Sequence, residues 1–160
     1  MAADHLKIDT AFATLPHPGQ SESGDLCLIK RMGKGTLLAV VDGLGHGQEA
    51  AAAAHAATMT WLGVGNVGGL LLRADLGNRP SRITLVPNAG FIGAEPAHPT
   101  ARSVALALGD TVILFSDGIK DGFAESLRLS NTPQQIADDV ITRHVKGNDD
   151  ALVLVARYAR

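Results

Sequence analysis

The chain has 160 residues, a size typical of one domain with a substantial hydrophobic core, and we expect a single domain over residues 1–160. Its formal net charge of −2 gives no basic face for nucleic acid, and no apolar run is long enough to cross a membrane. The single cysteine excludes an intrachain disulfide and fits a reducing cytoplasm. We therefore expect a cytoplasmic protein in which Cys27 is a small buried strand residue.

The first third of the chain predicts three strands. Alternating apolar residues over 6–13 predict the first strand. Strands over 26–30 and 36–41 flank the segment KRMGKG, which is typical of a hairpin turn. In an antiparallel pair the start of one strand lies beside the end of the next, so we expect Asp25 and Asp42 to meet at one end of the sheet.

The segment 37–60, LLAVVDGLGHGQEAAAAAHAATMT, predicts a buried strand, an acidic corner at Asp42, a glycine loop and a helix over 48–59. Three interpretations of the corner remain open: a phosphate-binding loop, a tight turn with a solvated aspartate, or a carboxylate that binds a metal. Asp42 would repel a phosphate, and the loop has no GK[ST] sequence, which disfavours the first interpretation. The third gains support if partner carboxylates lie elsewhere in the chain.

The rest of the chain predicts further strands and one more helix. The expected strands cover residues 70–74, 81–86, 102–108, 111–116 and 151–158, with a short strand or turn over 61–66. A helix is expected over 130–144, with Asn131 or Thr132 as its N-cap, Pro133 at its first position and Gly147 as its stop.

Acidic residues follow or precede four of these apolar strands, at Asp25, Asp42, Asp117 and the pair Asp149 and Asp150. Carboxylates gathered at one sheet end would repel one another without cations. Oxygen donors without a His-x-x-x-His pair or a cysteine cluster favour Mg²⁺ or Mn²⁺ over zinc. Two such cations about 3.5–4 Å apart would activate a water for in-line attack on phosphorus. The alternative is that each aspartate only begins or ends a turn.

Four motifs together resemble the SpoIIE-type, metal-dependent protein phosphatases of the type 2C superfamily. They are SGD at 23–25, VVDGLGHGQEA at 40–50, FSDGI at 115–119 and NDDALVLVAR at 148–157, in the family's order. WLGVGN at 61–66 is similar to the small RsbX-like members. The resemblance implies hydrolysis of phosphoserine or phosphothreonine on proteins of bacterial stress and sporulation signalling.

The resemblance also implies a fold and a site. The fold class is α+β, a four-layer αββα sandwich of two antiparallel sheets flanked by helices, with two Mn²⁺ or Mg²⁺ ions. Carried over by motif, Asp42 would bridge both ions, and the carbonyl of Gly43 would assist one of them. Asp117 and Asp149 would complete the shell of the other ion, and Asp25 would hold a coordinated water or contact an ion directly.

The chain departs from the family pattern in two ways. Relatives usually carry a second long helix and another strand before WLGVGN, whereas Thr58 here runs almost directly into Trp61. One helical layer should therefore be shortened, and the apolar sheet face left open should be covered by a partner or a dimer. The second departure is that no residue matches the arginine that binds substrate phosphate in the larger eukaryotic relatives.

Asp25, Asp42 and His46 are the candidate catalytic residues. His46 could be a general acid toward the leaving serine oxygen, or a loop histidine bonded to backbone or an acidic neighbour. The expected partner is a phosphorylated, STAS-type regulatory protein, and the chain is expected to be a monomer or weak dimer. The alternative is a degenerate member that binds such a partner without turnover.

Overall fold

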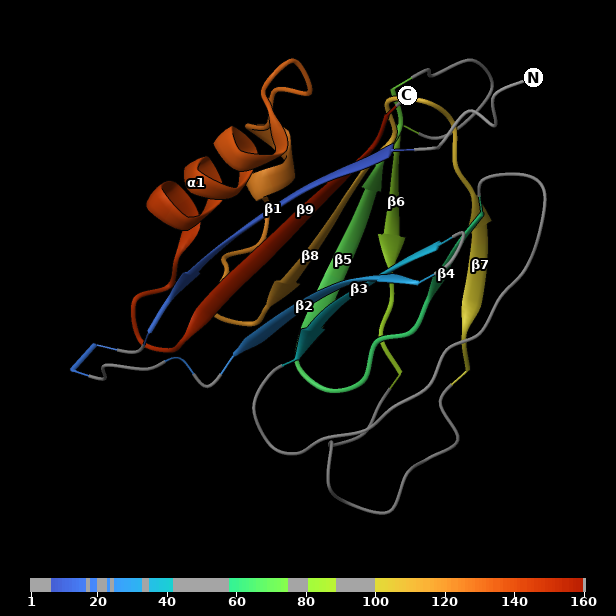
Figure 1. Ribbon diagram of the computed structural model, residues 1–160. Coiled ribbons are helices and arrows are strands. Elements are labelled where there is room, and N and C mark those ends of the chain that lie inside the picture. The colour runs from blue at the N-terminus through green and yellow to red at the C-terminus, as the bar shows by residue number, and fades with distance from the viewer. Residues whose placement is uncertain are drawn as a thin grey trace, which may run out of the picture.

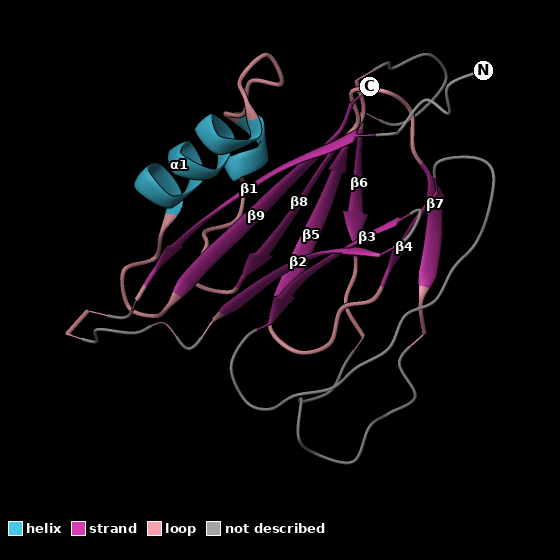
Figure 2. Cartoon of the chain, in the orientation of Figure 1, coloured by secondary structure: helices cyan, strands magenta, loops and turns pink. Residues whose placement is uncertain are grey.

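The computed structural model describes residues 7–16, 18–19, 23, 25–32, 35–41, 58–74, 81–88 and 100–159. These residues form three antiparallel sheets and one α-helix, so the fold is mainly β (Figures 1 and 2). The elements are β1 (Lys7–Leu15), β2 (Leu26–Met32), β3 (Gly35–Val41), β4 (Thr58–Trp61), β5 (Val67–Leu72), β6 (Arg82–Leu85), β7 (Arg102–Ala105), β8 (Thr111–Ser116), the 3₁₀ helix η1 (Phe123–Glu125), α1 (Pro133–His144) and β9 (Ala151–Ala159). No helix among these residues is long and apolar enough to span a membrane.

The largest sheet has five strands in the order β1-β9-β8-β5-β6. Its central strands are continuous apolar runs because both of their faces are covered. On one face Ile113 and Val153 pack with Ile136 and Val140 of α1, which lies over β1 and β9 (Figure 1). On the other face Leu114 and Leu154 pack with side chains of β2, β3, β4 and β7.

The helix α1 confirms the expectation drawn from the residues at its N-terminus. The hydroxyl of Thr132 accepts a hydrogen bond from the backbone N–H of Gln135 at 3.2 Å, and the Gln135 side chain accepts one from the Thr132 N–H at 2.9 Å. Pro133 occupies the first helical position, where its missing N–H is of no consequence. The expected stop at Gly147 is wrong, because the helix ends at His144 with Val145 extended as its C-cap, and Gly147, with φ of 81°, lies two residues beyond it.

The β2–β3 hairpin is also confirmed, with Leu26 opposite Val41 and Met32 opposite Gly35. Cys27 lies on the side of β2 that packs against the five-stranded sheet, where it is half-buried. This burial raises the pKa of the Cys27 thiol to about 11. The thiol is therefore protonated at neutral pH.

The fold expectation is confirmed in its antiparallel sheets and corrected at one helix. The described residues contain one helical layer, and β2–β3 and β4–β7 are separate two-stranded sheets, so these residues do not show a four-layer sandwich. The expected helix over 48–59 is wrong at its end, where Met59 lies in β4 opposite Val104. Met59 and Trp61 turn toward the core while Thr58 and Thr60 are exposed, which is the two-residue period of a strand. Residues 48–57 lie outside the described part of the chain.

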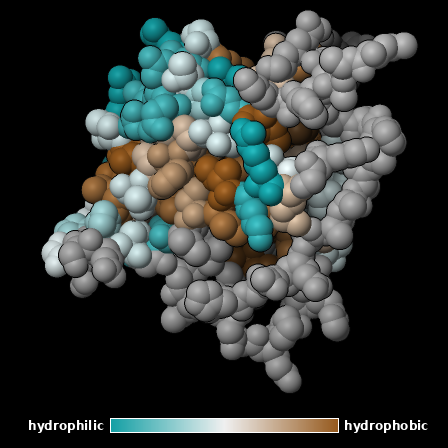
Figure 3. Space-filling model, in the orientation of Figure 1, coloured by the Kyte–Doolittle hydropathy of each residue, from teal (hydrophilic) through white to brown (hydrophobic). Residues whose placement is uncertain are grey.

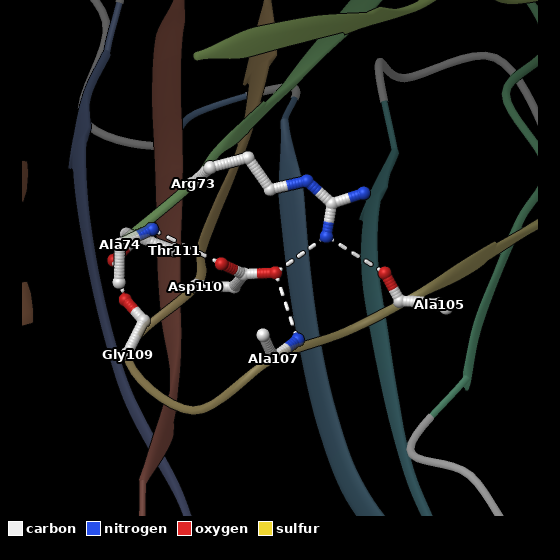
Figure 4. Close-up of polar contacts among 7 residues, drawn as sticks. All are labelled: Arg73, Ala74, Ala105, Ala107, Gly109, Asp110 and Thr111. Atoms are coloured by element: carbon white, nitrogen blue, oxygen red, sulfur yellow. Dashed lines mark hydrogen bonds and ion pairs between the residues drawn. The ribbon is translucent and has the colours of Figure 1, made fainter. Parts of the chain in front are cut away.

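A buried ion pair joins the β4–β7 sheet to the five-stranded sheet (Figure 4). Arg73 follows β5, and its Nη1 donates to Asp110 Oδ2 at 2.6 Å and to the carbonyl oxygen of Ala105, the last residue of β7, at 2.7 Å. Asp110 precedes β8 and also accepts from the backbone N–H groups of Ala107 at 2.9 Å and Ala74 at 3.1 Å. The side chains of Arg73 and Asp110 are 6% and 0% exposed.

The helix covers only part of the sheet. Figure 3 shows hydrophilic side chains over α1 and hydrophobic side chains over the strands beside it. A groove of about 320 Å³ lies between β5, β6, β8 and η1, with Leu70, Leu85, Phe115 and Phe123 among its lining residues.

Candidate functional site

The acidic corners predicted in the second half of the chain lie at one end of the five-stranded sheet. Asp117 directly follows β8, and Asp149 and Asp150 directly precede β9. Because β8 and β9 are antiparallel neighbours, with Phe115 opposite Val153, the end of one strand lies beside the start of the other.

Asp25 directly precedes β2 of a different sheet and is connected to the same sheet end by Ser116, the last residue of β8. The Ser116 hydroxyl donates a hydrogen bond to Asp25 Oδ2 at 2.6 Å, across 91 positions of sequence. The hydroxyl oxygen of Ser116 also accepts a hydrogen bond from the backbone N–H of Leu152 at 3.0 Å. Ser116 is 1% exposed, and Asp25 and Asp117 are half-buried.

The turn after Asp117 passes very close to the residues that precede β9. A Cβ atom built on Gly118 would overlap the backbone carbonyl oxygen of Asp150, so the close approach requires glycine. The Gly118 carbonyl oxygen accepts from the N–H of Lys146 at 2.8 Å, which fastens the turn to the segment after α1. The SDG motif therefore has a structural reason for its glycine besides any role of its aspartate.

Asp149 is exposed, and its Oδ1 accepts a hydrogen bond from the backbone N–H of Asp150 at 2.9 Å. The three remaining predicted site residues, Asp42, Gly43 and His46, lie outside the described part of the chain. The last described residue before them is Val41, which pairs with Leu26.

The described residues fit a hard divalent cation in their chemistry but do not by themselves form its shell. Within the described ranges, no group of three or more His, Cys, Asp or Glu residues could hold a metal ion. The donors nearest this sheet end are carboxylates of Asp25, Asp117 and Asp149, the oxygen ligands that Mg²⁺ and Mn²⁺ prefer. A complete shell would need donors from beyond the described residues.

Sequence reasoning missed two residues that connect the sheets, Ser116 at this sheet end and Arg73 at the opposite end of β8. Ser116 could have been found, since it is the polar end of the apolar run TVILFS and directly precedes the acidic corner. Arg73 follows the apolar run of β5, and nothing local shows that its partner is Asp110, 37 positions away.

No protein-family model matches the sequence, and no curated protein matches it. Solved structures do match in fold. A chain from the bacterial stressosome, a modular system adapted to control secondary messenger signalling, matches with a TM-score of 0.72 and 23% identity, over 94% of this chain and 100% of that one. RsbX in complex with magnesium matches with a TM-score of 0.70 and 15% identity, over 96% and 98% of the two chains.

The PP2C phosphatase domain of SpoIIE from Bacillus subtilis, solved with a fragment of its regulatory domain, matches with a TM-score of 0.69 and 20% identity. That match covers 96% of this chain and 62% of the SpoIIE chain. The chain therefore has a reduced form of the PP2C phosphatase fold, as the motifs indicated. At these identities the likeness establishes the fold alone.

Proposed function

We propose that this chain is a metal-dependent phosphatase that hydrolyses phosphoserine or phosphothreonine on a bacterial regulatory protein. The observation that carries the proposal is the hydrogen bond from Ser116 to Asp25, which holds an acidic residue of one sheet beside the acidic turn of another. The likeness to SpoIIE and RsbX over nearly the whole chain supports it, as does the magnesium bound by RsbX. The stressosome relative supports a partner in signalling, for which we propose a STAS-type protein.

The proposed site would hold two Mn²⁺ or Mg²⁺ ions through Asp25, Asp42, Asp117 and Asp149, with help from the Gly43 carbonyl. When bound, the ions would supply an activated water for attack on phosphorus. The contribution of the chain is to hold negative charge at one sheet end and to orient it. Ser116 orients Asp25, and the close packing at Gly118 holds the turn that carries Asp117 against the start of β9. His46, which lies beyond the described residues, would act as the general acid toward the leaving serine oxygen.

The test is hydrolysis of p-nitrophenyl phosphate and of a phosphoserine protein, with Mn²⁺ and with a chelator. We expect Mn²⁺-dependent turnover by the wild-type chain and none by Asp117→Asn. The matched control is Asp138→Asn on the exposed face of α1, where the carboxylate accepts a hydrogen bond from Gln134 at 2.8 Å. This control should keep wild-type activity.

Stability separates a catalytic role of Asp117 from a structural one. Removing one of several like charges relieves repulsion in the metal-free protein, so metal-free Asp117→Asn should melt no lower than wild type. A much lower melting temperature would show that Asp117 is structural. A folded wild-type chain without Mn²⁺-dependent hydrolysis of either substrate would refute the enzyme and favour a module that binds its partner without turnover.

A further inference from the structure

Ser116 is a buried residue at the end of an apolar strand, and its hydroxyl both donates and accepts a hydrogen bond. Burying a hydroxyl is unfavourable unless it is hydrogen-bonded. The Ser116 oxygen accepts from the Leu152 N–H at 3.0 Å and donates to Asp25 Oδ2 at 2.6 Å. Leu152 is 1% exposed, so this acceptor serves an N–H group of a residue that is shielded from water.

The two contacts assign the direction of each hydrogen bond. An amide N–H can only donate, so the contact with Leu152 engages a lone pair of the Ser116 oxygen. A hydroxyl carries a single proton, and this proton is then directed to Asp25. The distance of 2.6 Å lies in the range of about 2.5–2.7 Å that is usual for a hydroxyl bonded to an ionised carboxylate.

We propose that Ser116 is a positioning residue that sets the orientation of the Asp25 carboxylate for divalent cation binding. This inference rests on the proposed function. Asp25 precedes a strand of the small β2–β3 sheet, whereas Ser116 is anchored to the backbone of β9 inside the five-stranded sheet. The hydroxyl thus connects the orientation of Asp25 to the rigid sheet that also carries Asp117.

The experiment measures Mn²⁺ affinity of the full chain by isothermal titration calorimetry, a readout that does not require turnover. Removing a partner that orients a metal ligand typically weakens metal affinity about 10- to 100-fold, and we expect this for Ser116→Ala. Ser116→Cys keeps a weak donor and a weak acceptor at this position, so it should fold if alanine does not and should also bind Mn²⁺ more weakly.

Thr111→Val is the matched control, because it removes a buried hydroxyl from the opposite end of the same strand. The Thr111 hydroxyl accepts from Arg157 Nε at 3.0 Å and is remote in register from Ser116. The control should lower the melting temperature, as the Ser116 variants do, but leave Mn²⁺ affinity unchanged. In an Asp25→Asn background, Ser116→Ala should weaken Mn²⁺ binding little further, because the two residues act as a unit.

Two negative results distinguish a failure of the Ser116 role from a failure of the proposed function. A wild-type chain that binds Mn²⁺, together with Ser116 variants that bind it equally tightly, would overturn the role of Ser116 alone. A folded wild-type chain that binds no Mn²⁺ would overturn the proposed function and this inference with it.

Discussion

The ion pair between Arg73 and Asp110 should be a main determinant of stability, and Asp110→Asn tests it with a change of a few atoms. Both oxygens of the Asp110 carboxylate accept hydrogen bonds. Oδ2 accepts from Arg73 Nη1 and the Ala107 N–H, and Oδ1 accepts from the Ala74 N–H. An asparagine amide has an NH₂ group at one of these two positions, so at least one donor would face another donor. The substitution would also leave the Arg73 charge buried without its counter-charge.

The expected loss is large on the scale of the whole protein. Removing one member of a buried ion pair typically destabilises by about 3–5 kcal/mol, whereas a domain is stable by about 5–15 kcal/mol in total. Arg73 would keep the Ala105 carbonyl at 2.7 Å, but its Nε is already buried without a partner among the described residues. We therefore expect a loss within that 3–5 kcal/mol range, measured by urea unfolding at pH 7.

The same chemical change at Asp139 is the control. Asp139 accepts from Arg143 Nε at 2.8 Å on α1, in a pair whose side chains are 23% and 67% exposed. Exposed pairs at this helical spacing contribute about 0.3–0.5 kcal/mol, so Asp139→Asn should have almost no effect. If Asp110→Asn destabilised the protein no more than Asp139→Asn does, the ion pair would not hold the sheets together.

Two further predictions concern packing and burial. Gly118→Ala should destabilise the chain strongly because its Cβ would overlap the Asp150 carbonyl. Gly147→Ala is the control, since no described atom lies within 4 Å of its new Cβ, and its left-handed backbone should cost only about 1–2 kcal/mol of unfolding free energy. Equal melting temperatures of the two variants would contradict the close packing. Burial raises the pKa of Cys27 to about 11, so little of the reactive thiolate is present at pH 8. The folded chain should therefore react with DTNB at pH 8 about 100-fold more slowly than the chain unfolded in urea, and its rate should rise as the pH approaches 11. Fast reaction of the folded chain at pH 8 would show that the thiol is not buried.

Elements whose signals are local were predictable from the sequence. Thr132 and Pro133 specify the start of α1 through a cap and a fixed backbone angle, which involve only neighbouring residues. The run TVILFS is a central strand because continuous apolar residues are stable only where both faces are covered, and the structure has β8 over the expected range, Thr111–Ser116. The placement of acidic residues at strand ends was likewise predictable from the sequence. The antiparallel pairing of β8 and β9 then brings the end of β8 and the start of β9 together.

The tertiary structure decided what depends on distant neighbours. Met59 extends an alanine-rich segment that favours a helix, yet it lies in β4 because pairing with Val104 and burial against the core outweigh local propensity. The partners of Arg73 and Ser116 lie 37 and 91 positions away, and no periodicity of the sequence encodes such pairs. Desolvation is the physical reason, since a buried charge or hydroxyl is stable only beside the partner that the packing of whole sheets provides.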